Sequence, residues 1–262
     1  MSCDIYTILM NQAILMSNDF SNLRDKEYPG RLIIIGRDLS DENVIIVYAI
    51  TGRSPSSQAR RISLTTEGAW VMPTDEKILG EGNRDLLIYP AILFGQDLAV
   101  SNGKQTLDIH NHLSPGLDAK DILSNALHHW EYEPDAPSFT PRISGCVLSD
   151  GKAALSIIKR ADDCSASKHY FKVPMLPGEG KMISTYSGEN RDPLPSFQGD
   201  PEDVRLTYDT AKETAEAVYS ALRPKKQAKD FRVAVVCVFS REQTTADFNI
   251  SVINKSEIKQ NE

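Results

Sequence analysis

The chain has 262 residues, of which 40% are hydrophobic and 25% are charged. These fractions match soluble globular proteins and argue against a disordered, collagen-like or coiled-coil chain. The 29 basic and 36 acidic residues leave a net charge of -7, so no field of the whole molecule attracts nucleic acid or anionic lipid. An anionic ligand therefore requires a local basic site. The length is compatible with one large α/β or α+β domain.

The start of the chain and its cysteines favour a cytoplasmic protein. No basic stretch is followed by an apolar stretch and a small-residue cleavage site. The most apolar early run, residues 5–16, is interrupted by Asn11 and Gln12 and is shorter than the ~20 apolar residues that span a bilayer. We therefore expect no membrane segment. The cysteines lack CxxC spacing and fit a reducing compartment; they are Cys3, Cys146, Cys164 and Cys237.

The first part of the chain predicts one helix followed by short strands. Residues 4–24 carry apolar side chains at three- and four-residue spacing, which is typical of an amphipathic helix. After Pro29 and Gly30, two β-branched runs at 31–36 and 43–50 flank a polar turn and predict a hairpin buried on both faces. Further strands are expected at residues 61–65, 69–72, 85–89, 91–94 and 98–101, with a tight turn at 101–104.

The remainder of the chain repeats this theme. A helix is expected over residues 118–130, with Asp118 or Asp121 near its N-terminus, and another from about residue 201 to 222. Residues 188–199 are rich in Pro, Asn, Asp and Ser and predict an exposed loop. The chain from Lys255 predicts a flexible tail. The expected strands are residues 142–149, 153–159, 170–175, 181–186, 231–240 and 248–254.

The order of these elements predicts the fold class. Strands outnumber helices, arrive as hairpins and do not alternate with helices, which disfavours a doubly wound parallel sheet. We expect an α+β domain in which two sheets pack together and helices cover them. No repeat of 20–50 residues is present in the sequence, which argues against a solenoid or propeller.

Asp108, His110 and His112 suggest a metal site, which has to be weighed against a simpler explanation. In a strand these three side chains would share one face and could converge on an ion. No second cluster completes a ligand set, so a solvated loop is the favoured explanation and no metal is expected. His128 and His129 close the helix in mid-chain, where a cation near the last carbonyls is favourable.

Two polar stretches are unusual for a plain core. In residues 48–61 a buried strand runs into a loop with Arg53, Arg60, Arg61 and several hydroxyls, a set that suits a phosphate or a carboxamide. A solvated hairpin loop is the alternative. In residues 130–143 three acids stand close together, and like-charge repulsion can raise the pKa of one carboxyl, as a general acid or base requires. An exposed acidic turn is the alternative there.

Sequence motifs of several other enzyme classes are missing. Gly178-Glu-Gly-Lys181 has Met175 and Met182 where a phosphate-binding loop needs glycine and a hydroxyl. The sequence contains no G-x-G-x-x-G before a helix and no G-x-S-x-G elbow. Ser2 and Cys3 precede a helix, which disfavours an N-terminal nucleophile.

Several segments, taken in order, carry a family resemblance. They are Tyr28-Pro-Gly-Arg-Leu-Ile-Ile-Ile-Gly36, residues 48–60, Leu87-Ile-Tyr89, Val100-Ser-Asn-Gly103 with Thr106 and Asp108, Tyr132-Glu-Pro-Asp135 and Thr140-Pro-Arg-Ile143. With their order and spacing, the chain resembles the archaeal-type inosine monophosphate (IMP) cyclohydrolases and their bacterial relatives. The similarity covers roughly residues 28–143 and continues more vaguely through Ile183-Ser-Thr-Tyr186 to the region near Gly199.

The resemblance implies a fold and a reaction. The fold is like that of the N-terminal nucleophile hydrolases, with four layers in the order αββα and no self-processing. It would form a single domain at residues 28–254, after a helical extension at 1–27 and before a flexible tail at 255–262. The reaction closes 5-formamidoimidazole-4-carboxamide ribonucleotide (FAICAR) to IMP with loss of water in de novo purine biosynthesis. The resemblance implies no cofactor, a purine nucleotide substrate, no nucleic acid and a homo-oligomer.

By matching positions, the resemblance also implies site residues. Arg60, Tyr89 and Glu133 would lie in the active site. As hypotheses, Glu133 handles the proton, Arg60 stabilises the oxyanion or positions the formyl group, and Tyr89 donates a hydrogen bond or relays a proton. The expected nucleotide contacts are Arg31, Arg53, Ser54, Asn102, Thr140 and Arg142.

Two positions depart from the family pattern and keep other functions open. Ala59 and Pro90 stand where the family often carries asparagine, so two polar groups are missing near the expected site. This departure favours a nucleotide-binding relative that has lost or changed its chemistry. Glu133 and Tyr89 favour catalysis, because a carboxylate at the base does not help to bind an anionic nucleotide. A third hypothesis, an amide hydrolase acting on a related C–N bond, lacks a Ser/His/Asp or Cys/His arrangement.

Overall fold

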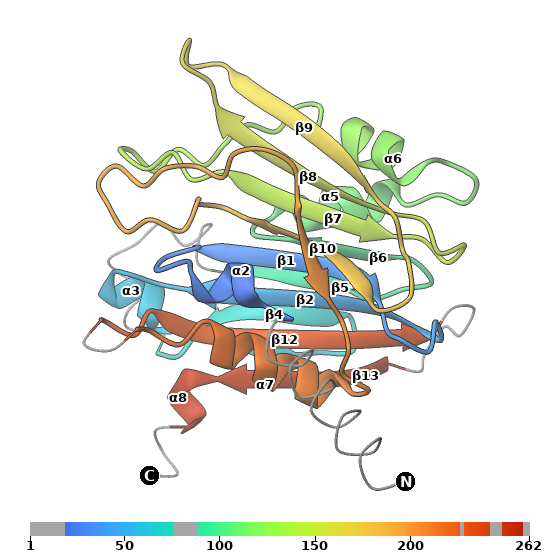
Figure 1. The fold of residues 1–262 in the computed structure, drawn as a ribbon. Coiled ribbons are helices and arrows are strands. Elements are labelled where there is room, and N and C mark those ends of the chain that lie inside the picture. The colour runs from blue at the N-terminus through green and yellow to red at the C-terminus, as the bar shows by residue number, and fades with distance from the viewer. Residues whose placement is uncertain (1–18, 76–87, 226–227, 242–247, 259–262) are drawn as a thin grey trace, which may run out of the picture.

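Two antiparallel sheets form the body of the protein (Figure 1). The computed structural model describes residues 19–75, 88–225, 228–241 and 248–258. The first sheet has six strands in the order β11 (Glu202–Arg205), β10 (Glu179–Ser184), β1 (Arg31–Arg37), β2 (Asn43–Thr51), β12 (Arg232–Arg241) and β13 (Phe248–Asn254). The second has seven in the order β3 (Arg60–Leu64), β4 (Gly68–Pro73), β5 (Tyr89–Leu93), β6 (Leu98–Ser101), β7 (Arg142–Val147), β8 (Ala153–Arg160) and β9 (Ala166–Val173).

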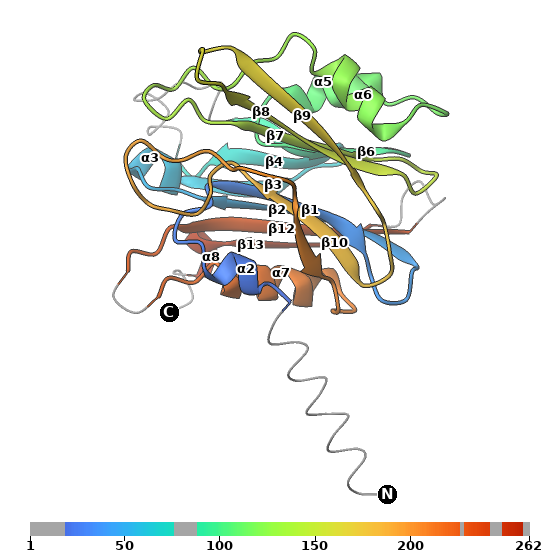
Figure 2. The ribbon, with the colours of Figure 1, turned by 45° about the horizontal axis from the view of Figure 1, so that its top comes forward.

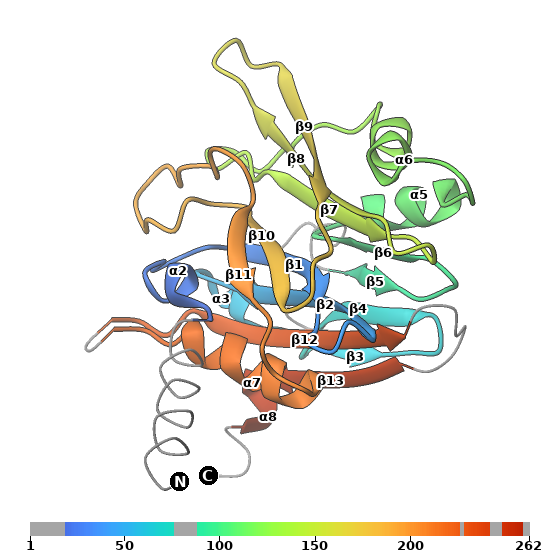
Figure 3. The same ribbon diagram turned by 45° about the vertical axis from the view of Figure 1, so that its right-hand side comes forward.

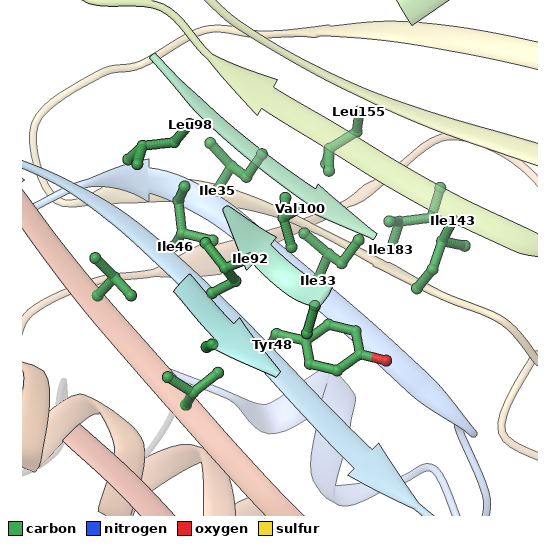
Figure 4. Close-up of a cluster of buried hydrophobic side chains, with 14 of the residues drawn as sticks. Ile33, Ile35, Ile46, Tyr48, Ile92, Leu98, Val100, Ile143, Leu155 and Ile183 are labelled. Carbon is green, nitrogen blue, oxygen red and sulfur yellow. The ribbon is translucent and has the colours of Figure 1, made fainter. Parts of the chain in front are cut away.

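The main hydrophobic core lies between the two sheets. Ile33 and Ile46 of the first sheet lie in one buried cluster with Ile92 and Ile143 of the second (Figure 4). Alternate residues of β1 and β2 belong to a second cluster, on the opposite face of their sheet. Both faces of these strands are therefore removed from water, which explains their unbroken β-branched runs. The predicted hairpin, buried on both faces, is confirmed.

Helices pack on the outer face of each sheet (Figures 2 and 3). Helix α7 (Ala211–Ala221) contacts β12 and β13 of the first sheet, while α5 (Gln105–His112) and α6 (Ala119–Ala126) contact strands of the second. The hydroxyl of Thr210 caps α7 by accepting from Glu213 N, and the carboxylate of Asp118 caps α6. The short helices are α2 (Ser21–Arg24), α3 (Pro55–Gln58) and α8 (Lys255–Ile258). Among the described residues, no helix is long and apolar enough to cross a membrane.

Three sequence expectations for the secondary structure are wrong. The stretch around Asp108 is helix α5 rather than a strand or loop, because the Ser101 hydroxyl, bonded to Gly103 and Thr106, turns the chain after β6. Residues 202–205 are edge strand β11, and α7 starts only after the Thr210 cap. Residues 255–258 form α8 instead of a frayed tail.

Other expectations hold in part. Of the strand expected at 85–89, residues 85–87 lie outside the described residues. Tyr89 belongs with most of the strand expected at 91–94 to one strand, β5, which tolerates Pro90 opposite Trp70 because the pairing with β4 has a bulge there. Of the helix expected over 4–24, residues 4–18 lie outside the described residues, and Ser21–Arg24 form the short helix α2. The loop at 188–199 is exposed at its tip but is anchored by buried Leu194 and Phe197.

Asn254 ties the two sheets together at their shared edge. Its Oδ1 accepts from Ile62 N at 2.8 Å and its Nδ2 donates to Ile62 O at 3.0 Å, which joins the end of β13 to β3. The Asn254 side chain is buried, so both Ile62 groups depend on it for a partner.

Replacing Asn254 with leucine should destabilise the fold. The substitution leaves the Ile62 N–H and C=O buried without partners, which costs about 1–3 kcal/mol for each such group. The free energy of unfolding, measured by urea denaturation, should fall relative to Asn249→Leu, which changes an exposed asparagine on the same strand. Equal unfolding midpoints for the two variants would contradict a bridging role.

Candidate active site

A polar cavity opens where several strands of both sheets begin. Its volume is about 280 Å³. Arg31 starts β1 in the first sheet and Arg60 starts β3 in the second. The segment between α6 and β7 supplies four more lining residues, and the others come from the chain before β1, around α3 and after β10. The residues that line it are Tyr28, Arg31, Arg53, Ser54, Ser56, Ser57, Arg60, Glu133, Asp135, Ser138, Thr140, Tyr186 and Leu194.

Arg31 and Glu133 form a charged pair inside this cavity. The Arg31 guanidinium nitrogen lies 3.8 Å from a Glu133 carboxylate oxygen. The Nε of Arg31 is buried and has no hydrogen-bond partner among the described residues. Burial by itself would lower the pKa of Arg31, but the Glu133 carboxylate opposes this effect and the pKa is raised. Arg31 therefore stays charged and keeps one buried donor that no described group satisfies.

Glu133 is the deepest acid of the site. Its side chain is only 2% exposed, and Asn102 Nδ2 donates to its Oε1 at 3.2 Å. Burial raises the pKa of Glu133, while the charges of Arg31 and Arg142 act in the opposite direction. A carboxyl group whose charged form is disfavoured by burial can exchange a proton closer to neutral pH than an ordinary glutamate does.

Arg60 supplies a second cation from the other sheet. It is 3% exposed, and its Nε donates to Ser57 O at 3.0 Å. Burial and the nearby charge of Arg31 lower its pKa. Ser54 caps the short helix α3 before it and accepts from Ser57 N. The turn that carries these serines thereby holds the Arg60 head group at the cavity wall.

Tyr48 and Tyr89 form a buried pair that crosses between the sheets. Their hydroxyl oxygens lie 2.7 Å apart, with Tyr48 on β2 and Tyr89 on β5. Neither side chain is accessible to solvent. Burial, followed by the interaction with Tyr89, raises the pKa of Tyr48, so its phenol keeps its proton. Figure 4 shows Tyr48 among the apolar side chains of the inter-sheet core.

A network of buried hydrogen bonds around the Asn102 side-chain amide lies behind Glu133. Asn102 Oδ1 accepts from Ile143 N and from Gln105 Nε2, and its Nδ2 also donates to Pro141 O. Arg142 donates from Nε to Glu131 O at 2.8 Å and from Nη1 to Gln105 Oε1 at 3.1 Å. These bonds hold the segment that carries Glu133 against the second sheet.

The glycine before Arg31 allows a close approach of two chain segments. Gly30 has φ +77°, and a Cβ at this position would lie 2.1 Å from Thr185 Oγ1 and 2.6 Å from the Tyr186 ring. Neither contact is possible for a real side chain. Gly30 therefore brings Tyr186 next to Arg31 in the cavity wall.

Thr140 links Asp135 and Tyr186 in the wall of the cavity. Its hydroxyl donates to Asp135 and lies 2.6 Å from the Tyr186 hydroxyl, and Asp135 also accepts from Thr140 N. Burial raises the pKa of Tyr186 to about 12. The wall therefore presents a neutral phenol beside the Asp135 carboxylate.

The mouth of the cavity is more exposed. Arg53 lies over the Tyr28 ring, 5.5 Å from its centroid, and donates to Asp192 at 2.8 Å and to Asn190 at 3.3 Å. Its side chain is 29% exposed, against 12% for Arg31. The positive charge thus extends from the buried floor to the entrance.

The structure brings most of the expected site residues together. Arg31, Arg53, Ser54, Arg60, Glu133 and Thr140 line the cavity, whereas Tyr89, Asn102 and Arg142 lie behind its wall. The lining residues that sequence reasoning did not select are Tyr28, Ser56, Ser57, Asp135, Ser138, Tyr186 and Leu194. All of these except Ser138 and Leu194 lie in segments that carry the family resemblance, so the resemblance was the signal that could have selected them.

The stretch with Asp108, His110 and His112 is built differently from a metal site. Asp108 Oδ2 accepts from Trp130 Nε1 at 2.7 Å and lies 3.2 Å from His129 Nε2. His112 Nδ1 contacts the Asp108 carbonyl within α5. Within the part of the chain that the structure describes, no three His, Cys, Asp or Glu side chains are grouped as metal ligands.

Comparisons with known proteins point to one family. Among solved structures, Anbu from Hyphomicrobium sp. strain MC1 aligns with 88% of this chain and 90% of its own at 13% identity, but the TM-score of 0.36 is too low to assign a fold. The IMP cyclohydrolase of Methanopyrus kandleri is 32% identical over 161 residues, which cover 61% of this chain and 75% of the relative. That of Halobacterium salinarum is 26% identical over 195 residues, covering 74% and 85%. The family model described as IMP cyclohydrolase-like protein matches residues 28–244, and the chain belongs to this family.

Proposed function

We propose that the protein is an IMP cyclohydrolase, which closes FAICAR to IMP with loss of water. The observation that carries the proposal is the buried Arg31, Glu133 and Arg60 cluster, which combines an acid of raised pKa with two cations in one cavity. The family and the named relatives support it. The proposal requires neither a metal nor an organic cofactor.

The reaction needs proton transfer and stabilisation of negative charge. The carboxamide nitrogen attacks the formyl carbon, a C–N bond forms, and the formyl oxygen gains negative charge. The carboxamide nitrogen and the formamido nitrogen each lose one proton, the oxygen accepts both and leaves as water, and the C=N bond of the new ring forms at the formamido nitrogen. Holding the two substituents of the imidazole together lowers the barrier further, because the attack becomes intramolecular.

The geometry favours particular roles for the cluster. Glu133, with its raised pKa, would accept the carboxamide proton and return a proton to the departing oxygen. The unpartnered Nε of Arg31 would donate to the developing oxyanion, with Arg60 as the second cation. Arg31 was expected only as a nucleotide contact, and its orphaned donor is the reason for this stronger role. Tyr89, which lies behind the cavity wall, would act as a hydrogen-bond donor.

The mouth of the cavity suits the ribose phosphate. Arg53 offers a partly exposed guanidinium, and Ser54, Ser56 and Ser138 line the wall beside it. A nucleotide would then place its phosphate near solvent and its base carboxamide against Arg31 and Glu133. Asn102 and Arg142 lie behind the wall, so we assign them to positioning the Glu133 segment instead of touching the nucleotide.

A nucleotide-binding protein without catalysis is the second candidate. Pro90 in β5 pairs with Trp70, whose buried indole nitrogen has no partner among the described residues. An unsatisfied polar group therefore lies next to one of the two positions that depart from the family pattern, which supports a changed site. An amide hydrolase has no comparable support, because the lining residues include neither cysteine nor histidine.

The finer architecture is also a proposal. Helices on the outer faces of two packed sheets support four layers in the order αββα, like the N-terminal nucleophile hydrolases but without self-processing. We propose one domain over residues 28–254. A cytoplasmic homo-oligomer that uses no nucleic acid would suit an enzyme acting on a free nucleotide.

Turnover of FAICAR tests the function directly. Purified protein, with chelator present, should form IMP, followed by ultraviolet absorbance. Glu133→Gln keeps the size of the side chain but removes the proton acceptor, and should lower kcat by ~10²–10⁴, as loss of a general acid or base does. Glu131→Gln, two residues away and exposed, is the matched control. Binding of IMP without turnover by the unmodified protein would favour the second candidate.

The pH profile tests the raised pKa of Glu133. A base must be deprotonated, so kcat/KM should fall as the pH falls through the Glu133 pKa. Because burial raises this pKa, the fall should occur above the ordinary value of 4.5. A profile that stays flat down to that value, in wild type and in Glu131→Gln, would exclude Glu133 as the base.

A double-mutant cycle tests the tyrosine pair. If Tyr48 donates to Tyr89, the Tyr89 proton is left to point towards the cavity wall, so Tyr48→Phe should lower kcat by about 3–10-fold, in the range of one hydrogen bond, with KM little changed. When Tyr89 is already phenylalanine, Tyr48→Phe should have almost no further effect on kcat. Tyr208→Phe, outside the cavity, is the control. Independent, additive losses would show that Tyr48 is only structural.

A further inference from the structure

A second cavity lies on the α2 and α7 side of the first sheet. Its volume is about 290 Å³, close to the lower limit for small-molecule sites. One wall is the chain at and after α2, residues 24–27, and the other is the chain after α7, residues 222–225 with Ala228 and Lys229. Figure 2 shows α2 beside α7 on this side of the sheet. We call this cavity the basic pocket.

The basic pocket is positively charged in a protein whose net charge is -7. Two acids, Asp25 and Glu27, also line it, and both are engaged: Asp25 pairs with Lys225 at 3.5 Å and Glu27 accepts from Asn190 at 2.9 Å. The lining cations are Arg24, Lys26, Arg223, Lys225 and Lys229. A positively charged pocket on a negatively charged protein raises the local concentration of anions.

Two of these cations keep their charge uncompensated. Lys26 is neutralised by Glu202 at 2.7 Å. Arg223 and Lys229, in contrast, form no ion pair with any described residue. Among the described residues, the Lys229 ammonium donates to a neutral group, the Arg53 carbonyl, at 3.3 Å, and it lies over the Phe231 ring, 5.7 Å from the centroid. These two side chains can therefore meet the oxygens of a phosphate without first breaking a salt bridge.

The floor of the basic pocket is apolar. Leu222 and Phe231 are at most 8% exposed, and Pro224 and Ala228 complete the surface. An inorganic anion would leave this surface without a partner. A ligand that joins a flat, weakly polar ring to phosphate would use both the cations and the floor.

The basic pocket is in contact with the wall of the active site. Phe231 packs edge-on against Tyr28, with ring centroids 5.2 Å apart, and its carbonyl accepts from Gly52 N and Gln58 Nε2. The Lys229 ammonium donates to the backbone carbonyl of Arg53. Tyr28 and Arg53 both line the active-site cavity. A phosphate that attracts Lys229 therefore competes with the bond that holds Arg53.

We propose that the basic pocket binds a nucleoside phosphate, and that its occupancy changes the affinity of the active-site cavity through Lys229 and Arg53. The binding part stands on this pocket alone. The coupling part rests on the proposed function, because it assigns Arg53 to the substrate phosphate. Coupling of this kind is reciprocal, so the active-site nucleotide must change binding at the basic pocket by the same factor.

Calorimetry with adenosine diphosphate as the probe tests the binding. With saturating IMP present to occupy the active-site cavity, the full chain should still bind one equivalent of the probe. Arg223→Gln with Lys229→Gln keeps hydrogen-bond donors but removes both charges, and should weaken binding by ~10-fold or more, as expected for charged hydrogen bonds. Lys212→Gln, an exposed lysine of α7 outside the pocket, should have no effect.

Several results would overturn the proposal. Absence of binding up to ~1 mM probe, or equal affinity in the double variant and in Lys212→Gln, would remove the site. Pyrophosphate binding as tightly as adenosine diphosphate would show that the nucleoside is not recognised. An IMP affinity that does not change with the probe would remove the coupling. Failure of FAICAR turnover refutes only the proposed function, because the calorimetric binding of the probe requires no catalysis.

Discussion

A carboxylate buried between arginines is the constraint on which the site depends. A charge removed from water is tolerated only when it is paired and hydrogen-bonded. Glu133 meets this condition through Arg31 at 3.8 Å and the Asn102 amide at 3.2 Å. The balance is incomplete, since burial still raises its pKa. In the proposed function, that imbalance would suit Glu133 to proton transfer, because a fully compensated glutamate stays charged near neutral pH.

The two sheets supply the parts of this cluster separately. Arg31 comes from the first sheet, while Arg60 and the segment that carries Glu133 belong to the second. Packing of the apolar faces therefore assembles the site as well as the core, and contacts such as the Asn254 bridge contribute to both. Gly30 adds a local requirement, because only a residue without Cβ lets the chain pass so close to Tyr186.

The sequence predicted the elements whose patterns are strong. The β1 and β2 hairpin and the stripe of α6 follow from uninterrupted apolar runs and helical spacing, which tertiary contacts only reinforce. It failed at α5, where one buried apolar residue, Ile109, gives no period, and at β11, whose edge position depends on the distant strand β10. Leu194 lines the cavity from the loop at 188–199, and the composition of that loop does not indicate that Leu194 is buried.

By itself, the sequence determined the class of the fold, because hydrophobic periodicity is carried by neighbouring positions, while the family resemblance supplied the candidate site residues. Six of the nine expected site residues line one cavity. Only the tertiary structure decided that Asn102 and Arg142 lie behind the cavity wall and that the Nε of Arg31 has no partner among the described residues. It also decided that the basic pocket lies next to Arg53. These properties are distances and burial between segments far apart in the chain, and no local pattern encodes them.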